Sequence, residues 1–352
     1  MLGMARGSKN QKPTNVALHV SESGSPPAHD VLNRVADWAE LAGGAYSKNT
    51  LRAWRADWAA FSAHCVQTRS VSLPASAATV RDFLMAKHPI DQSSDNSRLT
   101  RRSPATLKRY LATITRIHRA SKLEDPCASE MVKLTMRAIA RAAGTRQRQA
   151  RAFGWSQLER FLRVDDESLR GARDRALVAL AYDTLGRIDE ISRIDVQHVI
   201  SEGDGSGTLF IERSKTDQEA EGHYAFLSAA TMEYIGVWCQ RAEISSGPLW
   251  RIVRGKAVVL ARRMSPAAIA ATFGRAALLA GLTSPDSQSF SGHSLRVGAT
   301  QDMLAAGIST AAVMQAGRWT DARMPARYGA RVSAKRGAMA QIAAAQGRSR
   351  AK

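Results

Sequence analysis

The apolar residues in the first third of the chain recur at helical spacing. From about residue 31 to residue 141 the pattern is helical, and its clearest stripe follows a 3-4-3-4 rhythm. That stripe consists of Leu51, Trp54, Trp58, Phe61 and Cys65. Five such positions on one face predict an amphipathic helix within a helical domain.

A second helix is predicted to begin at Ser103-Pro104, because proline is tolerated in the first turn of a helix. Its apolar stripe consists of Leu107, Leu111, Ile114 and Ile117. Four basic residues lie mostly off that stripe, namely Lys108, Arg109, Arg116 and Arg119. A basic flank on a well-packed helix suits contact with phosphates, while each side chain taken singly also fits a solvated surface.

The apolar pattern of residues 174–194 is helical with one interruption. Gly186 weakens the helix just before Arg187, so the pattern fits two helices that meet at a turn. Arg187 would stand at that junction, and Glu190, three residues further on, can reach back toward it. Another helix is predicted to open at residues 155–162.

A short hairpin is predicted after these helices. The glycine-rich run at 203–207 marks a turn before a β-branched and aromatic strand at 208–213, and residues 224–227 form the return strand. Lys215 falls in the connection between the two strands. Residues 230–285 are expected to form further helices, and residues 334–346 a small apolar one. The predicted fold class is mainly α, with a small antiparallel β-hairpin or sheet in the second half.

The length of 352 residues favours two domains at roughly 150 residues each. The predicted organisation is a disordered basic tail (1–30), a helical domain (31–145), a second domain (146–346) and a basic tail (347–352). Residues 137–154 are rich in arginine and include Arg146 and Arg148. Their charge suits a linker that runs along a nucleic-acid duplex.

The charge balance points to a polyanionic partner. The chain has 50 Lys and Arg against 31 Asp and Glu, a formal net charge of +19. Nucleic acid or an acidic membrane surface would offset that self-repulsion, although solvated arginine-rich faces are an alternative. Three scattered cysteines without a CxxC pair argue against a zinc site or a disulfide framework. No apolar run approaches membrane-spanning length, so a soluble cytoplasmic protein is expected.

One stretch, residues 291–328, concentrates groups that suit phosphate chemistry. His293 and Arg296 lie one helical turn apart, on a helix that Ser291 is predicted to cap. The imidazole offers a hydrogen bond and the guanidinium a charged fork. Trp319 adds an indole donor, and Tyr328 can act as a nucleophile where a neighbour stabilises its charge. Taken singly, these residues equally fit a capped helix with a surface arginine, core packing and an interface aromatic.

The whole constellation resembles the C-terminal catalytic signature of the tyrosine recombinases, the phage integrase family. The matching wording is GHSLRVGA at 292–299, MQAGRWT at 314–320 and a tyrosine nine residues after the tryptophan. Upstream, AYDTLGRIDEISRI at 181–194 holds an R-x-x-E element, and its arginine lies 109 residues before Arg296. The likeness covers about residues 45–346.

That resemblance implies a two-domain clamp on DNA that cleaves and rejoins strands without metal, ATP or cofactor. The tyrosine attacks the scissile phosphate to give a 3′-phosphotyrosyl enzyme, and the two arginines, the histidine and the tryptophan bind its non-bridging oxygens. The lysine protonates the leaving 5′-oxygen, and the glutamate holds its neighbours in place. The implied catalytic set is Arg187, Glu190, Lys215, His293, Arg296, Trp319 and Tyr328.

The resemblance also implies partners and an assembly. Double-stranded DNA with inverted-repeat sites would be bound by a monomer or dimer at one site and by a homotetramer at two synapsed sites, in a bacterial or phage-derived, nucleoid-associated setting. The helix at 337–345 would be passed to a neighbouring subunit in a closed ring.

Other functions remain open at this stage. They are a catalytically silent DNA-binding protein of the same fold, and a type IB topoisomerase-like relaxing enzyme or hairpin-forming resolvase. Three features depart from the family pattern: Asp189, Arg318 and the basic insert at 91–103, which is expected to be a loop that touches DNA.

Overall fold

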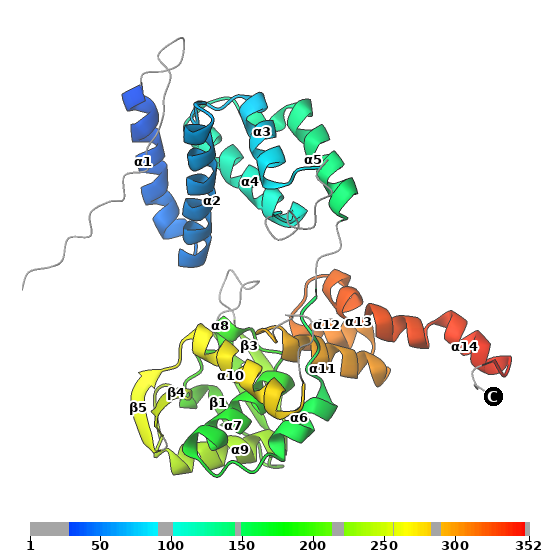
Figure 1. Ribbon diagram of the computed structural model, residues 1–352. Coiled ribbons are helices and arrows are strands. Elements are labelled where there is room, and N and C mark those ends of the chain that lie inside the picture. The colour runs from blue at the N-terminus through cyan, green and yellow to red at the C-terminus, as the bar shows by residue number, and fades with distance from the viewer. Residues whose placement is uncertain are drawn as a thin grey trace, which may run out of the picture. The chain divides into compact units, whose positions relative to one another are not determined.

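The chain separates into two compact units, residues 1–147 and 148–352, in the computed structural model (Figure 1). The structure describes residues 28–90, 101–144, 149–212, 222–255, 257–282 and 290–348. Several predictions concern positions outside these ranges: the tail up to residue 27, residues 91–100 of the basic insert, Arg146, Arg148, Lys215 and the last four residues.

The described residues of the first unit form a helical domain. Its helices are α1 (Ala28–Ala45), α2 (Lys48–Gln67), α3 (Ala77–Lys87), α4 (Pro104–Ala120) and α5 (Glu130–Ala143), with a 3-10 turn at Pro126–Ala128. Serine side chains cap α2 to α5, each accepting a hydrogen bond from a backbone N–H in the first turn. Both predicted helices are confirmed, and Pro104 occupies the first turn of α4.

Residues of the predicted apolar stripes form much of the buried core of this unit. Phe61 of α2 packs edge-on against Phe83 of α3 at 5.2 Å between ring centroids, and Tyr110 of α4 lies 5.3 Å from the same ring. Leu107 and Ile114 complete the α4 stripe with almost no exposed surface. Because the stripe faces inward, the basic residues between its members remain on the outer side of α4.

The second unit combines nine helices with two small sheets in its described residues. The helices are α6 (Trp155–Leu162), α7 (Leu169–Asp183), α8 (Ile188–Ile191), α9 (Ala229–Arg241), α10 (Pro266–Leu279), α11 (Ser294–Ala305), α12 (Thr310–Gly317), α13 (Arg323–Arg336) and α14 (Ala338–Ala345), besides a 3-10 turn at Val196–His198. The strands are β1 (Val199–Ser201), β2 (Gly207–Ile211), β3 (His223–Leu227), β4 (Arg251–Arg254) and β5 (Val258–Arg263).

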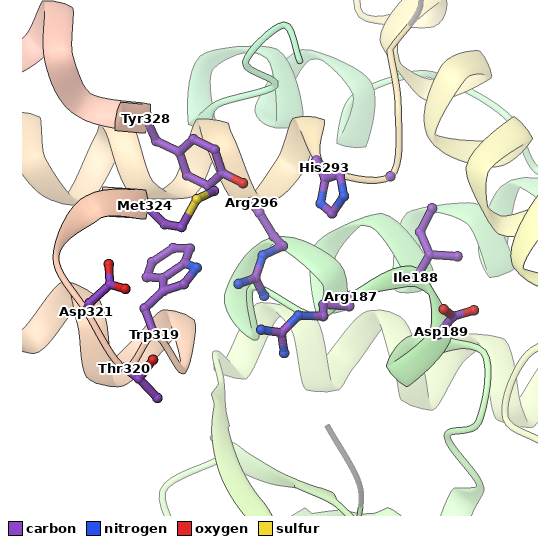
Figure 2. A pocket seen from close by; sticks show the side chains of 11 residues that line it. Arg187, Ile188, Asp189, His293, Arg296, Trp319, Thr320, Asp321, Met324 and Tyr328 are labelled. Atoms are coloured by element: carbon purple, nitrogen blue, oxygen red, sulfur yellow. The ribbon is translucent and has the colours of Figure 1, made fainter. Parts of the chain in front are cut away.

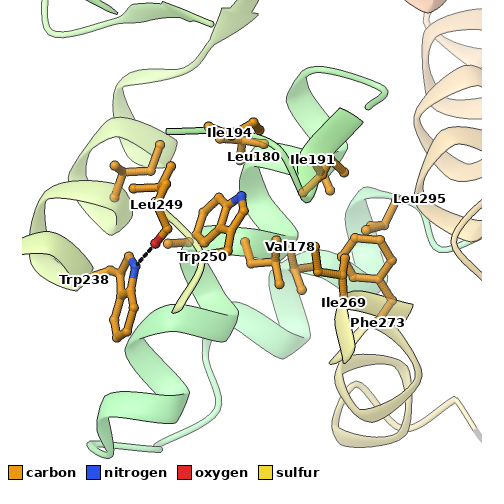
Figure 3. Close-up of a cluster of buried hydrophobic side chains, with 14 of the residues drawn as sticks. Val178, Leu180, Ile191, Ile194, Trp238, Leu249, Trp250, Ile269, Phe273 and Leu295 are labelled. Atoms are coloured by element: carbon orange, nitrogen blue, oxygen red, sulfur yellow. Dashed lines mark hydrogen bonds between the residues drawn. The ribbon is translucent and has the colours of Figure 1, made fainter. Parts of the chain in front are cut away.

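Helix α7 is the central element of this unit. It is buried on nearly all sides between residues 171 and 181 and packs against both α9 and α11. Around it lie two buried tryptophans, and Trp238 donates a hydrogen bond to the Leu249 carbonyl at 2.8 Å (Figure 3). The rigid α7 therefore presents its C-terminal end, at residue 183, to the turn that carries Arg187.

The sheets agree with the predicted fold class and add one element to it. Strands β1, β2 and β3 form an antiparallel sheet in that order, and β2–β3 is the predicted hairpin. The expectation of further helices at residues 230–285 is confirmed by α9 and α10, but it missed β4 and β5, which pair between them. Directly after β4, Gly255 adopts φ +61°, a backbone conformation that favours glycine.

Helix α11 approaches the start of this unit more closely than any side chain would allow. A Cβ atom on Gly298 would lie 2.0 Å from the Phe153 carbonyl oxygen, and the Phe153 N–H donates to the Ser294 carbonyl at 2.9 Å. Glycine is therefore required at this position of α11 because the opposing atoms are backbone.

We expect Gly298→Ala to lower the free energy of unfolding by about 1–3 kcal/mol, because the backbones must separate. Gly236 of α9 has open space around its Cα, so Gly236→Ala is a matched control that should stabilise by about 0.5–1 kcal/mol. Urea unfolding of both variants checks this, and equal effects would contradict the close approach.

Candidate active site

Five of the residues predicted to be catalytic line one cavity in the second unit. The cavity has a volume of about 630 Å³. Its lining consists of Arg187, Ile188, Asp189, Gly292, His293, Arg296, Trp319, Thr320, Asp321, Met324 and Tyr328. Figure 2 shows the imidazole, both guanidinium groups, the indole and the phenol gathered around this space. Segments that lie over 100 residues apart in the sequence thus converge on one site.

Arg187 occupies the N-cap position of α8, after a turn in which Leu185 adopts φ +48°. Its Nη1 donates to Glu190 Oε1 at 2.7 Å, and its backbone N–H donates to Glu190 Oε2 at 2.9 Å. The Glu190 side chain is only 4% exposed, against 19% for Arg187. The predicted arginine–glutamate pair is therefore formed, with the glutamate buried behind the arginine.

Arg296 lies in the first turn of α11 and is buried. Its guanidinium donates to the carbonyls of Leu185 and Gly317 and lies 4.9 Å from the centre of the Trp319 ring. Burial, followed by the charges of Arg187 and Arg318, lowers its pKa to about 10. The group therefore stays protonated at neutral pH.

The helix that carries Arg296 begins two residues later than predicted. His293, not Ser291, is the N-cap residue of α11. Ser291 instead accepts a hydrogen bond from the His293 N–H at 3.3 Å and donates its own N–H to Ser294 Oγ at 2.9 Å. These local hydrogen bonds form a turn before the helix, so the His293 imidazole lies at the edge of the cavity.

Trp319 and Tyr328 form the opposite wall of the cavity. Their rings meet edge to face, with centroids 5.8 Å apart. Tyr328 belongs to α13, and its backbone carbonyl accepts hydrogen bonds from Gln301 at 2.9 Å and from Gln149 at 3.3 Å. The half-buried tyrosine is thus fixed through its main chain as well as its ring.

Arg318 is the residue of this site whose role the sequence did not reveal. It caps α12 in the left-handed conformation, with φ +53°. Its side chain is 6% exposed, and its Nη2 donates to Glu190 Oε2 at 2.7 Å. In the sequence it appeared only as a bulky departure from the family pattern, since nothing there indicated that Glu190 would lie beneath it.

Two carboxylates border the cavity without joining its cluster of positive charge. Asp189 is exposed and points away from the guanidinium groups (Figure 2). Asp321 accepts the Arg323 N–H at 2.8 Å at the start of α13. Within the described ranges, no group of three or more His, Cys, Asp or Glu side chains is placed to hold a metal ion.

The basic residues of α4 have different surroundings from one another. Arg109 pairs with buried Asp57 at 2.9 Å, and Arg119 pairs with Asp125 at 3.0 Å. The guanidinium of Arg116 lies 4.5 Å from the Trp54 ring centre and donates to the Tyr46 hydroxyl at 2.9 Å. Lys108 is exposed. Their role in binding DNA stays a prediction.

The fold agrees with comparisons to known proteins. Residues 152–334, more than half of the chain, match the phage integrase family model. The chain is 29% identical to the recombinase Cre of Escherichia phage P1 over 85% of its length and 88% of Cre. It is 28% identical to an integrase/recombinase XerD homologue of Selenomonas ruminantium over 80% of its length and 81% of that protein.

A solved structure gives the same picture of the fold. The site-specific recombinase XerH, bound to a palindromic difH substrate, superposes with a TM-score of 0.60 at 15% identity, over 91% of this chain and 92% of that one. The chain therefore belongs to the phage integrase family, the tyrosine recombinases, and is by class a site-specific recombinase. No helix in the described residues is long and apolar enough to cross a membrane.

Glu190 should make the stability of this unit sensitive to acid. Burial opposes its ionisation, but the charge of Arg318 and the hydrogen bonds from Arg187 together hold its pKa below the usual 4.5. A carboxyl with a lowered pKa stabilises the fold above its unfolded pKa, and this stabilisation is lost as pH falls through the folded value. Between pH 5 and pH 3, we expect the free energy of unfolding to fall less for Glu190→Gln than for wild type, as measured by urea titration. Parallel curves of this free energy against pH would contradict the prediction.

Proposed function

We propose that the protein is a site-specific DNA recombinase that cleaves and rejoins strands through a 3′-phosphotyrosyl intermediate on Tyr328. The observation that carries the proposal is the cavity itself, where one phenol faces two guanidinium groups, an imidazole and an indole. A phosphodiester is anionic, and its non-bridging oxygens gain charge as a nucleophile adds. Fixed donors around such a group stabilise that transition state, each by about 3–4 kcal/mol.

The proposed chemistry is a balanced exchange of phosphate esters. The Tyr328 hydroxyl gives its proton to solvent as its oxygen bonds to the scissile phosphorus, and the bond from phosphorus to the 5′-oxygen breaks. Arg187 and Arg296 bind the non-bridging oxygens, assisted by His293 and Trp319. Lys215 donates a proton to the leaving 5′-oxygen. Because the phosphotyrosyl bond conserves the ester, another 5′-hydroxyl reseals the strand, and neither metal nor ATP is required.

The orientation of the pocket residues supports these roles. Arg296 uses two of its nitrogens on backbone carbonyls and lies against Trp319, so it presents a fixed charge. Glu190 anchors Arg187 from behind, and the Arg187 guanidinium points into the cavity toward Arg296 and Trp319 (Figure 2). Both arginines are held before any substrate arrives, and such preorganisation favours the transition state over the ground state.

The proposed partner is double-stranded DNA with inverted-repeat sites. The net charge of +19 supports a polyanion, and the XerH structure was solved with a palindromic substrate. A homotetramer on two synapsed sites is proposed by analogy, as a λ integrase tetramer on a Holliday junction superposes with a TM-score of 0.54 at 16% identity. The exposed Met339 and Ile342 of α14 would then pack on a neighbouring subunit.

The direct test is covalent trapping on a nicked suicide substrate taken from DNA around the protein's own gene. We expect wild type to form a protein–DNA adduct and Tyr328→Phe to form none, since phenylalanine keeps the ring but lacks the oxygen. Tyr234→Phe, on α9, is a matched control that should form the adduct normally. Tight binding without adduct from any variant would favour a catalytically silent binder, and relaxation of supercoiled DNA without strand exchange would favour a topoisomerase-like enzyme.

The proposed contacts of α4 with DNA predict different results for two basic residues. Lys108→Ala should reduce the slope of log affinity against log salt by about 1 without lowering the thermal midpoint. Arg116→Ala should weaken binding and also destabilise the first unit, because Trp54 and Tyr46 lose their packing partner. Filter-binding titrations with Lys133→Ala of α5 as control check this, and an unchanged salt slope for Lys108→Ala would contradict it.

A further inference from the structure

Arg318 holds a position that is unfavourable for an arginine in three respects. Its backbone is left-handed, a conformation that disfavours residues with a Cβ. Its charged side chain is 6% exposed, and its Nε lies buried without a hydrogen-bond acceptor among the residues that the structure describes. The guanidinium is nevertheless well held at its other end, by the carbonyl of Thr184 at 3.2 Å and by Glu190 at 2.7 Å.

Stability alone does not account for such a group. A buried ion pair gains little over well-packed apolar side chains, because desolvating the charges offsets their attraction. Here the pair is a triad, since the Glu190 carboxylate accepts from Arg187 through Oε1 and from Arg318 through Oε2. The triad connects the turn at 184–187 with the turn at 317–319, and these turns carry Arg187 and Trp319 of the cavity.

The charge of the triad bears on the chemistry. If Glu190 paired with Arg187 alone, its carboxylate would neutralise the Arg187 charge and would compete with a phosphate for the same guanidinium. With Arg318 as a second partner, the two guanidiniums and one carboxylate leave a net charge of +1. Glu190 Oε2 is engaged by Arg318 and by the Arg187 N–H, so the carboxylate is fixed on the side away from the cavity.

We infer that Arg318 is a positioning residue for the DNA-cleavage reaction: it offsets and fixes the Glu190 carboxylate, so that Arg187 keeps its charge and orientation for the scissile phosphate. The inference rests on the proposed function, because it assigns Arg318 a part in that reaction. Arg318 acts on the substrate only through its neighbours, as Arg318 is absent from the lining of the cavity.

The first measurement is the single-turnover rate of adduct formation at saturating protein, where changes in DNA affinity have no effect. Arg318→Met keeps a long, unbranched side chain and the same Cβ at this left-handed position, but removes the charge. We expect its rate, measured well below its own thermal midpoint, to fall about 10- to 100-fold, because Arg187 is no longer held in position for the phosphate. Arg318→Lys, which keeps the charge, should recover part of the rate.

Arg69→Met is the matched control, since Arg69 is an exposed arginine with the same φ of +53° in the first unit. It should leave the single-turnover rate within about twofold of wild type, because Arg69 belongs neither to the triad nor to the cavity lining and its exposed charge is screened by solvent.

The second measurement separates positioning from mere support of the fold. If Arg318 acts by offsetting the charge of Glu190, then Glu190→Gln should restore part of the rate in the Arg318→Met background. If Arg318 only supports the turn, the double variant should be slower than Arg318→Met by the factor that Glu190→Gln costs alone, and the inference is overturned. A wild-type rate for Arg318→Met overturns the inference alone, whereas absence of an adduct with wild type overturns the proposed function as well.

Discussion

The geometry of the cavity depends on the hydrogen bonds that the buried Arg296 guanidinium donates. It joins the carbonyl of Leu185, from the turn before α8, to the carbonyl of Gly317, at the end of α12. An unpaired buried charge would be strongly unfavourable, so these three segments are constrained to remain together. Arg187, Trp319 and the approach to Tyr328 all take their positions from that junction.

The surrounding fold makes this arrangement rigid. Helix α7 is enclosed by the core and brings its C-terminal end to the Arg187 turn, while α11 packs without a gap against residues 153–154 through Gly298. Helix α13 packs against α11 and receives hydrogen bonds at the Tyr328 carbonyl from both Gln149 and Gln301. A cavity rich in positive charge is therefore held open by the core, before any anion is present to offset its repulsion.

The sequence predicted the elements that follow a regular pattern. The stripe around Phe61, the proline start of α4 and the β2–β3 hairpin all appeared as predicted. The mainly α fold with a small antiparallel sheet and membership of the phage integrase family are also confirmed. These features depend on local spacing and on motif wording, both of which are visible along the chain.

What the sequence did not predict depends on contacts between distant residues. Strands β4 and β5 lie in a range that was expected to be helical. No clear alternation of apolar and polar residues signals these strands, and their pairing forms only across a turn. The N-cap of α11 is His293 and not Ser291, because Ser291 and Ser294 hydrogen-bond to each other in a turn before the helix. Arg318 gained its partner only when a segment 128 residues upstream folded beneath it.

We propose above all that Tyr328 is the residue that becomes joined to DNA. The most direct measurement is to trap the wild-type adduct, digest it with protease and nuclease, and identify the modified peptide by mass spectrometry. We expect a nucleotide attached through its 3′-phosphate to Tyr328 in the peptide that spans α13. A nucleotide attached to any other residue, or through a 5′-phosphate, would contradict it.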